Sequence, residues 1–216
     1  MFVQDFMTNN PITIATDGNI LDAEKKMLVK NIHRLPVVDK NGVLVGIVTD
    51  GDVRRAMPST ATSLDKFELH YLLGKIKIED IMTVKPFTIE ADAVLEKAAL
   101  IMYKNHIGGV VVTDEEQHPI GIITATDVFK VLVDSMGLGD GKTRVTLELP
   151  DKIGQLNILT GIFKDLNINI GSLVTKPLAE EKMMVVVRAA NVGDTQALAE
   201  KLQAAGFKVL HIAAIS

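Results

Sequence analysis

The sequence contains no cysteine and no tryptophan, and aromatic residues make up only 4% of it. Without cysteine there is no disulfide framework, no thiolate zinc site and no cysteine nucleophile. No apolar run approaches the roughly 20 residues of a membrane-spanning helix. The opening stretch MFVQDFMTNNP also lacks the charged and apolar regions of a signal peptide. These absences predict a cytoplasmic protein with no membrane partner.

Basic residues are few and scattered. Lysine and arginine number 23 against 27 acidic residues, which gives a net charge of −4. Nucleic-acid binding needs a positive stripe that follows the phosphates, so no nucleic-acid partner is predicted. The five histidines show no metal-ligand spacing, no G-x-S-x-G elbow occurs, and no pattern joins a nucleophile to a base. The sequence therefore predicts no metal site and no catalytic residues.

The chain does contain an internal repeat. Residues 5–57 align with residues 80–132 at a constant offset of 75 without a gap, and the stretch GIVTDGD at 46–52 returns as GIITATD at 121–127. A gapless match of this length indicates a duplicated unit. The identical pairs include Asp5/Asp80, Met7/Met82, Thr8/Thr83, Pro11/Pro86, Thr13/Thr88, Asp17/Asp92, Ala23/Ala98, Met27/Met102, Asp39/Asp114, Gly46/Gly121, Thr49/Thr124 and Asp52/Asp127.

Each copy predicts a β-α-β-β-α unit. A short strand leads to a helix, two strands follow, and a second helix is expected to start after Asp52 or Asp127. One such unit leaves an apolar face uncovered, so we expect the two copies to pack sheet to sheet about a pseudo-twofold axis. The residues expected on the buried helix faces are Ile20, Ala23 and Met27 in the first copy and Leu95, Ala98 and Met102 in the second.

The rest of the chain forms connections and a separate domain. Residues 58–79 bridge the copies, with a helix expected at FELHYLLGKI, and residues 136–142 form a glycine-rich linker. The GKT at 141–143 is not a phosphate loop, because Met136 stands where its first glycine is required. Residues 143–216 predict the β-α-β-β-α-β order of a ferredoxin-like fold, with Leu156, Leu159, Phe163 and Leu166 on one helix face.

The duplicated unit resembles the CBS domain. The motifs that carry this resemblance are IHRLPVVD, the two G-h-h-T-x-x-D elements, and the openings MTNNPITI and MTVKPFTI. The segment PDKIGQLNILTGIFKDLNINIGSL resembles the ACT domain, although Ile153 stands where that family usually has proline. With the bridge ELHYLLGKIKIEDIM, the whole chain resembles the acetoin-utilisation CBS–ACT proteins of bacteria.

This resemblance implies an α+β protein made of a tandem CBS pair and a C-terminal ACT domain. The expected boundaries are CBS repeat one at 1–57, the bridge at 58–79, CBS repeat two at 80–135, the linker at 136–142 and the ACT domain at 143–216. It also implies a regulatory, ligand-sensing protein and not an enzyme. A link to acetoin utilisation stays open, because the resemblance alone does not say what is regulated.

The doubled threonine–aspartate element suits an adenine nucleotide. An ionised Asp52 has two acceptor oxygens for the two ribose hydroxyls, and the Thr49 hydroxyl and the helix start can meet phosphate. The alternative is that Asp52 and Asp127 only cap their helices. The resemblance implies that Ala23 or Ala98 lines the adenine pocket and that the basic pair His33–Arg34 meets phosphates. The full predicted set is Thr13, Ala23, His33, Arg34, Thr49, Asp52, Thr88, Ala98, Gly109, Thr124 and Asp127.

The expected ligand is AMP, ADP, ATP or a related adenine compound acting as a regulator, with Mg²⁺ accompanying ATP and no cofactor required. S-adenosylmethionine, NAD and cyclic dinucleotides stay open. The ACT domain is expected either to bind a second small ligand, such as an amino acid, or to build a homodimer. Its ligand residues would be Asp151, Gly154, Gln155 and Leu156. The regulated protein is unknown, and two alternatives are an oligomerisation module and, less favoured, an enzyme acting on an adenine ligand.

Overall fold

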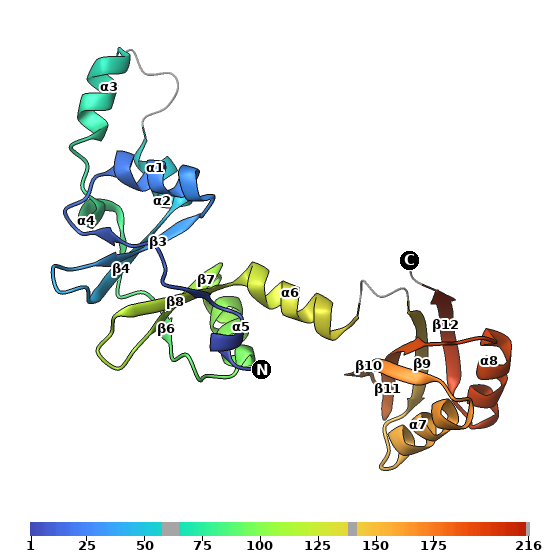
Figure 1. The fold of residues 1–216 in the computed structure, drawn as a ribbon. Helices are drawn as coiled ribbons and strands as arrows, with labels where there is room; N and C mark the ends of the chain where they lie inside the picture. Colours follow the sequence, from blue (N-terminus) through green and yellow to red (C-terminus); the bar gives the residue numbers. More distant parts are fainter. Residues whose placement is uncertain (58–64, 138–141, 215–216) are drawn as a thin grey trace. The chain divides into compact units, whose positions relative to one another are not determined.

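The computed structural model describes residues 1–57, 65–137 and 142–214, which form two compact units, Met1–Val128 and Phe129–Ser216. Figure 1 labels the helices and strands of both units. Residues 58–64 of the predicted bridge and 138–141 of the predicted linker lie outside the described residues. Among the described residues no helix is long and apolar enough to cross a membrane.

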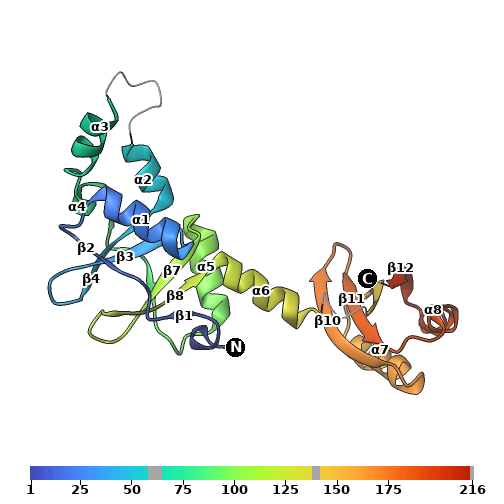
Figure 2. The ribbon, with the colours of Figure 1, turned by 45° about the horizontal axis from the view of Figure 1, so that its top comes forward.

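The first unit contains two four-stranded sheets, with strand orders β2-β3-β4-β5 and β1-β8-β7-β6. In each sheet the two long strands are the antiparallel hairpin that the sequence predicts, and helices pack against them (Figure 2). The elements are η1 Val3–Asp5, β1 Thr8–Asn9, β2 Ile14–Ala15, α1 Ile20–Lys30, β3 Arg34–Val38, β4 Leu44–Thr49, α2 Asp50–Ala56, α3 Lys66–Leu73, α4 Ile78–Ile81, β5 Thr83–Val84, β6 Thr88–Ile89, α5 Leu95–Asn105, β7 Gly109–Thr113 and β8 Pro119–Thr124. Helix α6, Ala125–Ser135, begins in the first unit and ends in the second.

The buried faces of α1 and α5 are those that the sequence predicts. Ile20, Ala23 and Met27 are buried on α1, and the equivalent Leu95, Ala98 and Met102 are buried on α5. Their spacing of three or four residues places them on one side of each helix. Complete burial of one aliphatic side chain contributes about 1.5–3 kcal/mol, so these faces fix how the helices pack on the sheets.

The repeats exchange their opening strands. β1 belongs to the first repeat but pairs with β8 of the second, where Thr8 lies opposite Ile122. β5 belongs to the second repeat but pairs with β4 of the first, where Thr83 lies opposite Ile47. Figure 2 shows β1 beside β8. Each sheet therefore needs a strand from the other repeat, a pairing that no pattern in the sequence predicts.

The glycines of the doubled element make this exchange possible. A Cβ placed on Gly46 would lie 2.5 Å from the Met82 sulfur, and one placed on Gly121 would lie 2.4 Å from the Met7 sulfur. Both methionines belong to the opening segment of the opposite repeat. A side chain at either glycine would therefore displace the exchanged segment. This explains why glycine recurs at the same place in both copies.

The second unit has the ferredoxin-like order that the sequence predicts. Its sheet order is β10-β11-β9-β12, and α7 and α8 cover one face of this sheet (Figure 1). The core of the unit includes Leu147, Leu159, Phe163 and Leu198. The elements are β9 Thr143–Pro150, α7 Gln155–Asp165, β10 Asn169–Pro177, β11 Lys182–Ala190, α8 Thr195–Ala204 and β12 Lys208–Ala214.

Candidate functional site

The threonine–aspartate element forms a reciprocal helix cap. In the first repeat the Thr49 backbone N–H and hydroxyl both donate to Asp52 Oδ2, at 2.8 and 2.7 Å, and the Asp52 N–H donates to Thr49 Oγ1 at 3.3 Å. This is a capping box, in which Thr49 is the cap and Asp52 the third helical residue. The expected helix start after Asp52 is therefore wrong, because α2 already begins at Asp50 and α6 begins at Ala125.

The second repeat builds the same box. Thr124 donates to Asp127 Oδ2 through its N–H at 2.8 Å and its hydroxyl at 2.6 Å, and the Asp127 N–H donates back to Thr124 Oγ1 at 3.3 Å. The capping role predicted as an alternative is thus real, although threonine and not aspartate occupies the cap position. A carboxylate held in this way presents its other oxygen away from the cap.

That other oxygen has different surroundings in the two repeats. Asp52 Oδ1 is paired with Arg55 Nη2, and the side chain of Asp52 is only 10% exposed. Lys130 stands at the position equivalent to Arg55. Among the described residues, no hydrogen bond or ion pair joins Asp127 Oδ1 to a partner. Within the described part of the chain, Asp127 Oδ1 therefore has no partner, whereas Asp52 Oδ1 is in an ion pair.

Arg34 reaches from the first repeat into the second. Its backbone lies opposite Thr49 on β4, but a Cβ on Gly109 would lie 2.0 Å from Arg34 Nη1 and one on Gly108 would lie 2.8 Å from Arg34 Nη2. The guanidinium therefore rests on the Gly108–Gly109 backbone. Gly109 itself lies opposite Thr124, so Arg34 is brought beside the second threonine–aspartate element.

Burial lowers the pKa of the Arg34 guanidinium below its usual value, while the nearby carboxylates of Asp50 and Asp127 act in the opposite direction. An arginine stays protonated at neutral pH. The Arg34 position is thus a partly desolvated positive charge with two carboxylates nearby. Such a charge interacts more strongly with an anion than an exposed one does, because water screens it less.

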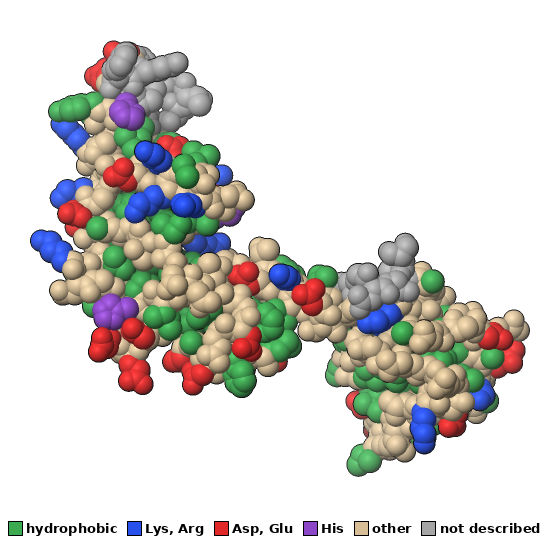
Figure 3. Space-filling view, viewed as in Figure 1, with side chains coloured by type: hydrophobic (Ala, Val, Ile, Leu, Met, Phe, Trp, Pro, Cys, Tyr) green, Lys and Arg blue, Asp and Glu red, His purple; other side chains and the backbone are tan. Residues whose placement is uncertain are grey.

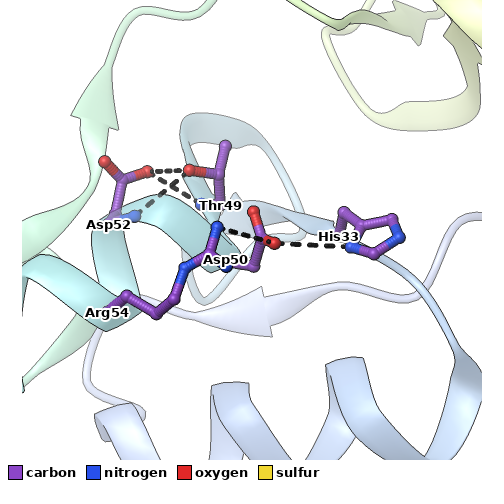
Figure 4. A network of polar contacts seen from close by, with 5 residues as sticks. All are labelled: His33, Thr49, Asp50, Asp52 and Arg54. Carbon is purple, nitrogen blue, oxygen red and sulfur yellow. Dashed lines mark hydrogen bonds and ion pairs between the residues drawn. The ribbon is translucent and has the colours of Figure 1, made fainter.

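The His33 side chain contacts a carboxylate of its own repeat. Its Nδ1 lies 3.4 Å from Asp50 Oδ2, and Arg54 Nη2 lies 3.2 Å from the same oxygen. Figure 4 shows this network beside the Thr49–Asp52 box. The His33 side chain is 71% exposed. Asp50 is thus a neighbouring carboxylate of both His33 and Arg34, and Arg34 also reaches the second repeat.

The remaining predicted nucleotide residues are spread over both repeats. Ala23 and Ala98 have no exposed surface and lie inside the repeats. Thr13 and Thr88 are half-buried at the short strands β2 and β6, and the Thr13 carbonyl accepts from Lys26 Nζ at 2.9 Å. A cavity of about 330 Å³ lies on the α1–α2 side, where Met27, Val53, His33 and Arg54 are among its lining residues.

The predicted ACT ligand residues lie around the turn that precedes α7. Gly154 caps this helix with a φ of 91°, a conformation that favours glycine. Asp151, Gly154 and Leu156 line an open cavity of about 640 Å³, together with Thr175 and Met183 of the neighbouring strands. Gln155 begins α7 but does not line the cavity. Ile153, in the position usually taken by proline, is fully exposed.

Two further observations bear on what the chain could bind. No group of three or more histidine, cysteine or acidic side chains arranged to hold a metal ion occurs in residues 1–57, 65–137 and 142–214. Acidic side chains gather around a histidine at the β7–β8 turn (Figure 3), where His118 Nδ1 lies 3.3 Å from Asp114 and 3.7 Å from Glu116. This turn contacts the first repeat, because the Leu44 N–H donates to the Gln117 carbonyl at 2.9 Å.

Comparison with protein families gives one match for each unit. The CBS domain model matches residues 3–59 and 78–134. The chain belongs to the CBS domain family. Residues 141–213 match the TTHA0829-like ACT domain model. The chain is thus a CBS pair followed by an ACT domain, as the motifs IHRLPVVD and G-h-h-T-x-x-D predict.

Solved CBS pairs resemble the first unit. The CBS domain pair of protein MJ0100, in complex with 5'-methylthioadenosine and S-adenosyl-L-methionine, is 31% identical over 62% of this chain and 97% of that chain, with a TM-score of 0.52. CBSX2 in complex with AMP is 29% identical over 62% of this chain and 96% of that chain, with a TM-score of 0.50. A protein of Vibrio cholerae assigned to acetoin utilization is 27% identical over 64% of this chain and 94% of that chain, with a TM-score of 0.53.

Among curated proteins, L-aspartate semialdehyde sulfurtransferase of Methanocaldococcus jannaschii is 33% identical over 60% of this chain. The match spans 23% of that protein. The similarity is therefore confined to part of the sulfurtransferase. It is therefore no evidence that this chain catalyses the reaction of that enzyme.

Proposed function

We propose that this CBS–ACT chain is a regulatory sensor that binds adenine nucleotides in its CBS pair. The observation that carries the proposal is the doubled Thr–Asp box with Arg34 of one repeat laid beside the box of the other. Each box holds a carboxylate at a helix start, where ribose hydroxyls have an acceptor. Arg34 adds a positive charge for phosphate.

The solved CBS pairs support the adenine part of the proposal. Two of them, at 31% and 29% identity, hold adenosine compounds. Those compounds share an adenine and a ribose but differ in charge, since AMP carries a phosphate and 5'-methylthioadenosine does not. Arg34 leads us to favour the phosphorylated class for this chain, with Mg²⁺ accompanying ATP. The predicted cytoplasmic location and the link to acetoin utilisation stay part of the proposal.

The proposed output is a change in a partner protein. A ligand shifts such a protein between states only by binding one state more tightly than the other. In the CBS pair the exchanged strands and Arg34 join the two repeats, so a ligand between them would alter contacts of both. The ACT turn at Asp151–Leu156 is proposed to bind a second small ligand, with an amino acid as the first class to test.

Thermal unfolding of the purified chain with a panel of adenine compounds tests the proposal. At a ligand concentration of about 100 times the dissociation constant, binding should stabilise the folded state by about 2.7 kcal/mol. AMP, ADP and ATP should raise the melting temperature, while guanosine nucleotides serve as controls. If no adenine compound shifts the melting temperature at millimolar concentration, the chain is an assembly module. Conversion of the bound compound, followed by chromatography, would instead indicate an enzyme.

We also infer a homodimer, predicted from the tendency of CBS pairs and ACT domains to associate through like surfaces. The structure supports this with large exposed side chains at equivalent positions. Leu28 on α1 is 75% exposed, and Tyr103, its counterpart on α5, is 79% exposed. A second copy would remove these side chains from water. Light scattering at micromolar concentration should give a dimer mass or larger, and a monomer mass would contradict the inference.

A further inference from the structure

The sheet of the ACT unit contains a buried arginine that has no partner among the residues that the structure describes. Arg188 on β11 is only 7% exposed, and its Nε is enclosed without a hydrogen-bond partner. No ion pair or hydrogen bond of its side chain occurs among the described residues. Burying a cation without a partner costs several kcal/mol. Such a group is an expected place for an anion to bind.

Arg188 lies on the face of the sheet that is opposite the helices. Val187 and Ala189 belong to the core beneath α7 and α8. Because successive side chains of a strand alternate between faces, Arg188 belongs to the opposite face. The same alternation on β9 places Val145 and Leu147 in the core and the intervening Thr146 on the face of Arg188.

A second arginine lies directly beside the first. Arg144 on β9 is the register partner of Arg188, and directly opposed side chains have Cβ atoms about 4.5–5.5 Å apart. Like charges in this arrangement destabilise a sheet. The Arg144 Nη1 donates to Thr146 Oγ1 at 2.7 Å, so one terminal nitrogen of Arg144 is fixed by a neutral hydroxyl and not by an acid.

Further hydrogen-bonding groups surround the pair. Thr146 is buried and accepts from Arg144, which leaves its hydroxyl proton to be donated elsewhere. Ser172 on β10 is the other register partner of Arg188, and its hydroxyl donates to the Met136 carbonyl at 3.1 Å. Three strands thus contribute to one polar group of residues around two positive charges.

Glu148, an acid on the same face of the sheet, is already engaged. Glu148 lies four residues from Arg144 along β9, which is about 13 Å at a rise of about 3.3 Å per residue. Lys182 Nζ lies 3.7 Å from Glu148 Oε1. Glu148 therefore does not neutralise the arginine pair.

We propose that Arg144 and Arg188 form a binding site for a small oxyanion with two negative charges. The fork of a guanidinium matches the oxygens of both phosphate and carboxylate, and two arginines together balance a phosphate dianion or a dicarboxylate. The remaining exposure of Arg188 and the half-buried Arg144 give a small anion access. This site is distinct from the Thr–Asp boxes of the CBS pair and from the turn at Asp151–Leu156.

The test uses the full chain, with inorganic phosphate and malonate as separate probes and chloride as the balancing anion at constant ionic strength. For each probe, thermal unfolding gives the change in melting temperature and calorimetric titration gives the affinity. A response to phosphate alone identifies a phosphorylated ligand, and a response to malonate alone identifies a dicarboxylate. Phosphate could also bind at the proposed nucleotide site of the CBS pair. Comparing the wild type with a variant of the arginine pair shows at which site phosphate raises the melting temperature.

Arg188→Met removes the charge and keeps an unbranched side chain. We expect the dissociation constant of the effective probe to rise about tenfold or more, which is the loss of one charge-assisted hydrogen bond. In chloride alone the variant should be at least as stable as the wild type, because the unpaired buried charge is gone. The matched control is Lys176→Met, an exposed cation on β10, which should keep the wild-type response.

Several outcomes would overturn the proposal. These are the absence of a response to both probes in the wild type, an equal response in Arg188→Met, and an equal loss in Lys176→Met. If circular dichroism shows that Arg188→Met is unfolded, Arg144→Gln replaces it, and an unchanged probe affinity in that variant overturns the proposal. Adenosine, which carries no anion, should stabilise the wild type and Arg188→Met equally. Its failure in both would count against the adenine site and not against the anion site.

Discussion

Replacing both Asp52 and Asp127 by asparagine should weaken the binding of adenine ribonucleotides about 10- to 100-fold at each site. The reason is the loss of charge-assisted hydrogen bonds to the ribose hydroxyls, each contributing about 1.5–3 kcal/mol. Asparagine keeps one acceptor oxygen, which can still receive the Thr49 or Thr124 N–H, so both helix caps survive. Calorimetric titration with AMP and with ATP measures the loss.

The single variants should differ. Asp127 has an acceptor oxygen with no partner among the described residues, whereas Asp52 is paired with Arg55. Asp127→Asn should therefore cost more affinity than Asp52→Asn. The matched control is Asp22→Asn at the start of α1, where the Asp22 carboxylate accepts from the side-chain amide of the cap residue Asn19 and lies outside the Thr–Asp boxes. Unchanged nucleotide affinity in the double variant would leave the boxes with a capping role only.

Arg34→Ala should weaken ADP and ATP binding about 10- to 100-fold and adenosine binding far less. A guanidinium can donate two parallel hydrogen bonds to phosphate, and adenosine has no phosphate to accept them. The difference between ATP and adenosine should shrink as salt is added, because ions screen the charge. Arg54→Ala is the control, since Arg54 is an exposed arginine of the same repeat that pairs with Asp50. Equal losses for adenosine and ATP would mean that Arg34 does not contact phosphate.

Gly109→Ala tests the same contact from the other repeat. The added Cβ would occupy the place of Arg34 Nη1, and the flexible end of the arginine should move while the fold persists. Gly109→Ala should therefore reproduce the selectivity loss of Arg34→Ala, with little added effect in the double variant. Additive losses would show that the two residues act separately.

Much of this arrangement follows from sequence periodicity. The buried triplets of α1 and α5 repeat at helical spacing, and the long strands β3, β4, β7 and β8 are continuous apolar runs between turn residues. The order of the ACT unit was predictable for the same reason. Periodicity works for these elements because each has one face in a core, and that face sets the pattern of its residues.

Other features depend on contacts that no local pattern contains. β1 and β5 have two residues each, too few to show a period, and their partners lie in the other repeat. The contact of Arg34 with Gly108–Gly109 could not be predicted, because His33–Arg34 and Gly108–Gly109 are aligned between the repeats but far apart in the sequence. The predicted helix start is misplaced because Thr49 both ends β4 and caps α2, and a threonine followed three residues later by an acid is a cap signature.

The exchanged strands also govern the order in which the chain can mature. β1 leaves the ribosome well before its partner β8, which is made more than a hundred residues later. Such distant pairing raises contact order and slows folding. Until β8 appears, the first repeat holds an unpaired strand, and the edge of β4 stays open until β5 is made. The two repeats therefore mature as one cooperative unit, and a nascent chain that stops after the first repeat exposes the edges that promote aggregation.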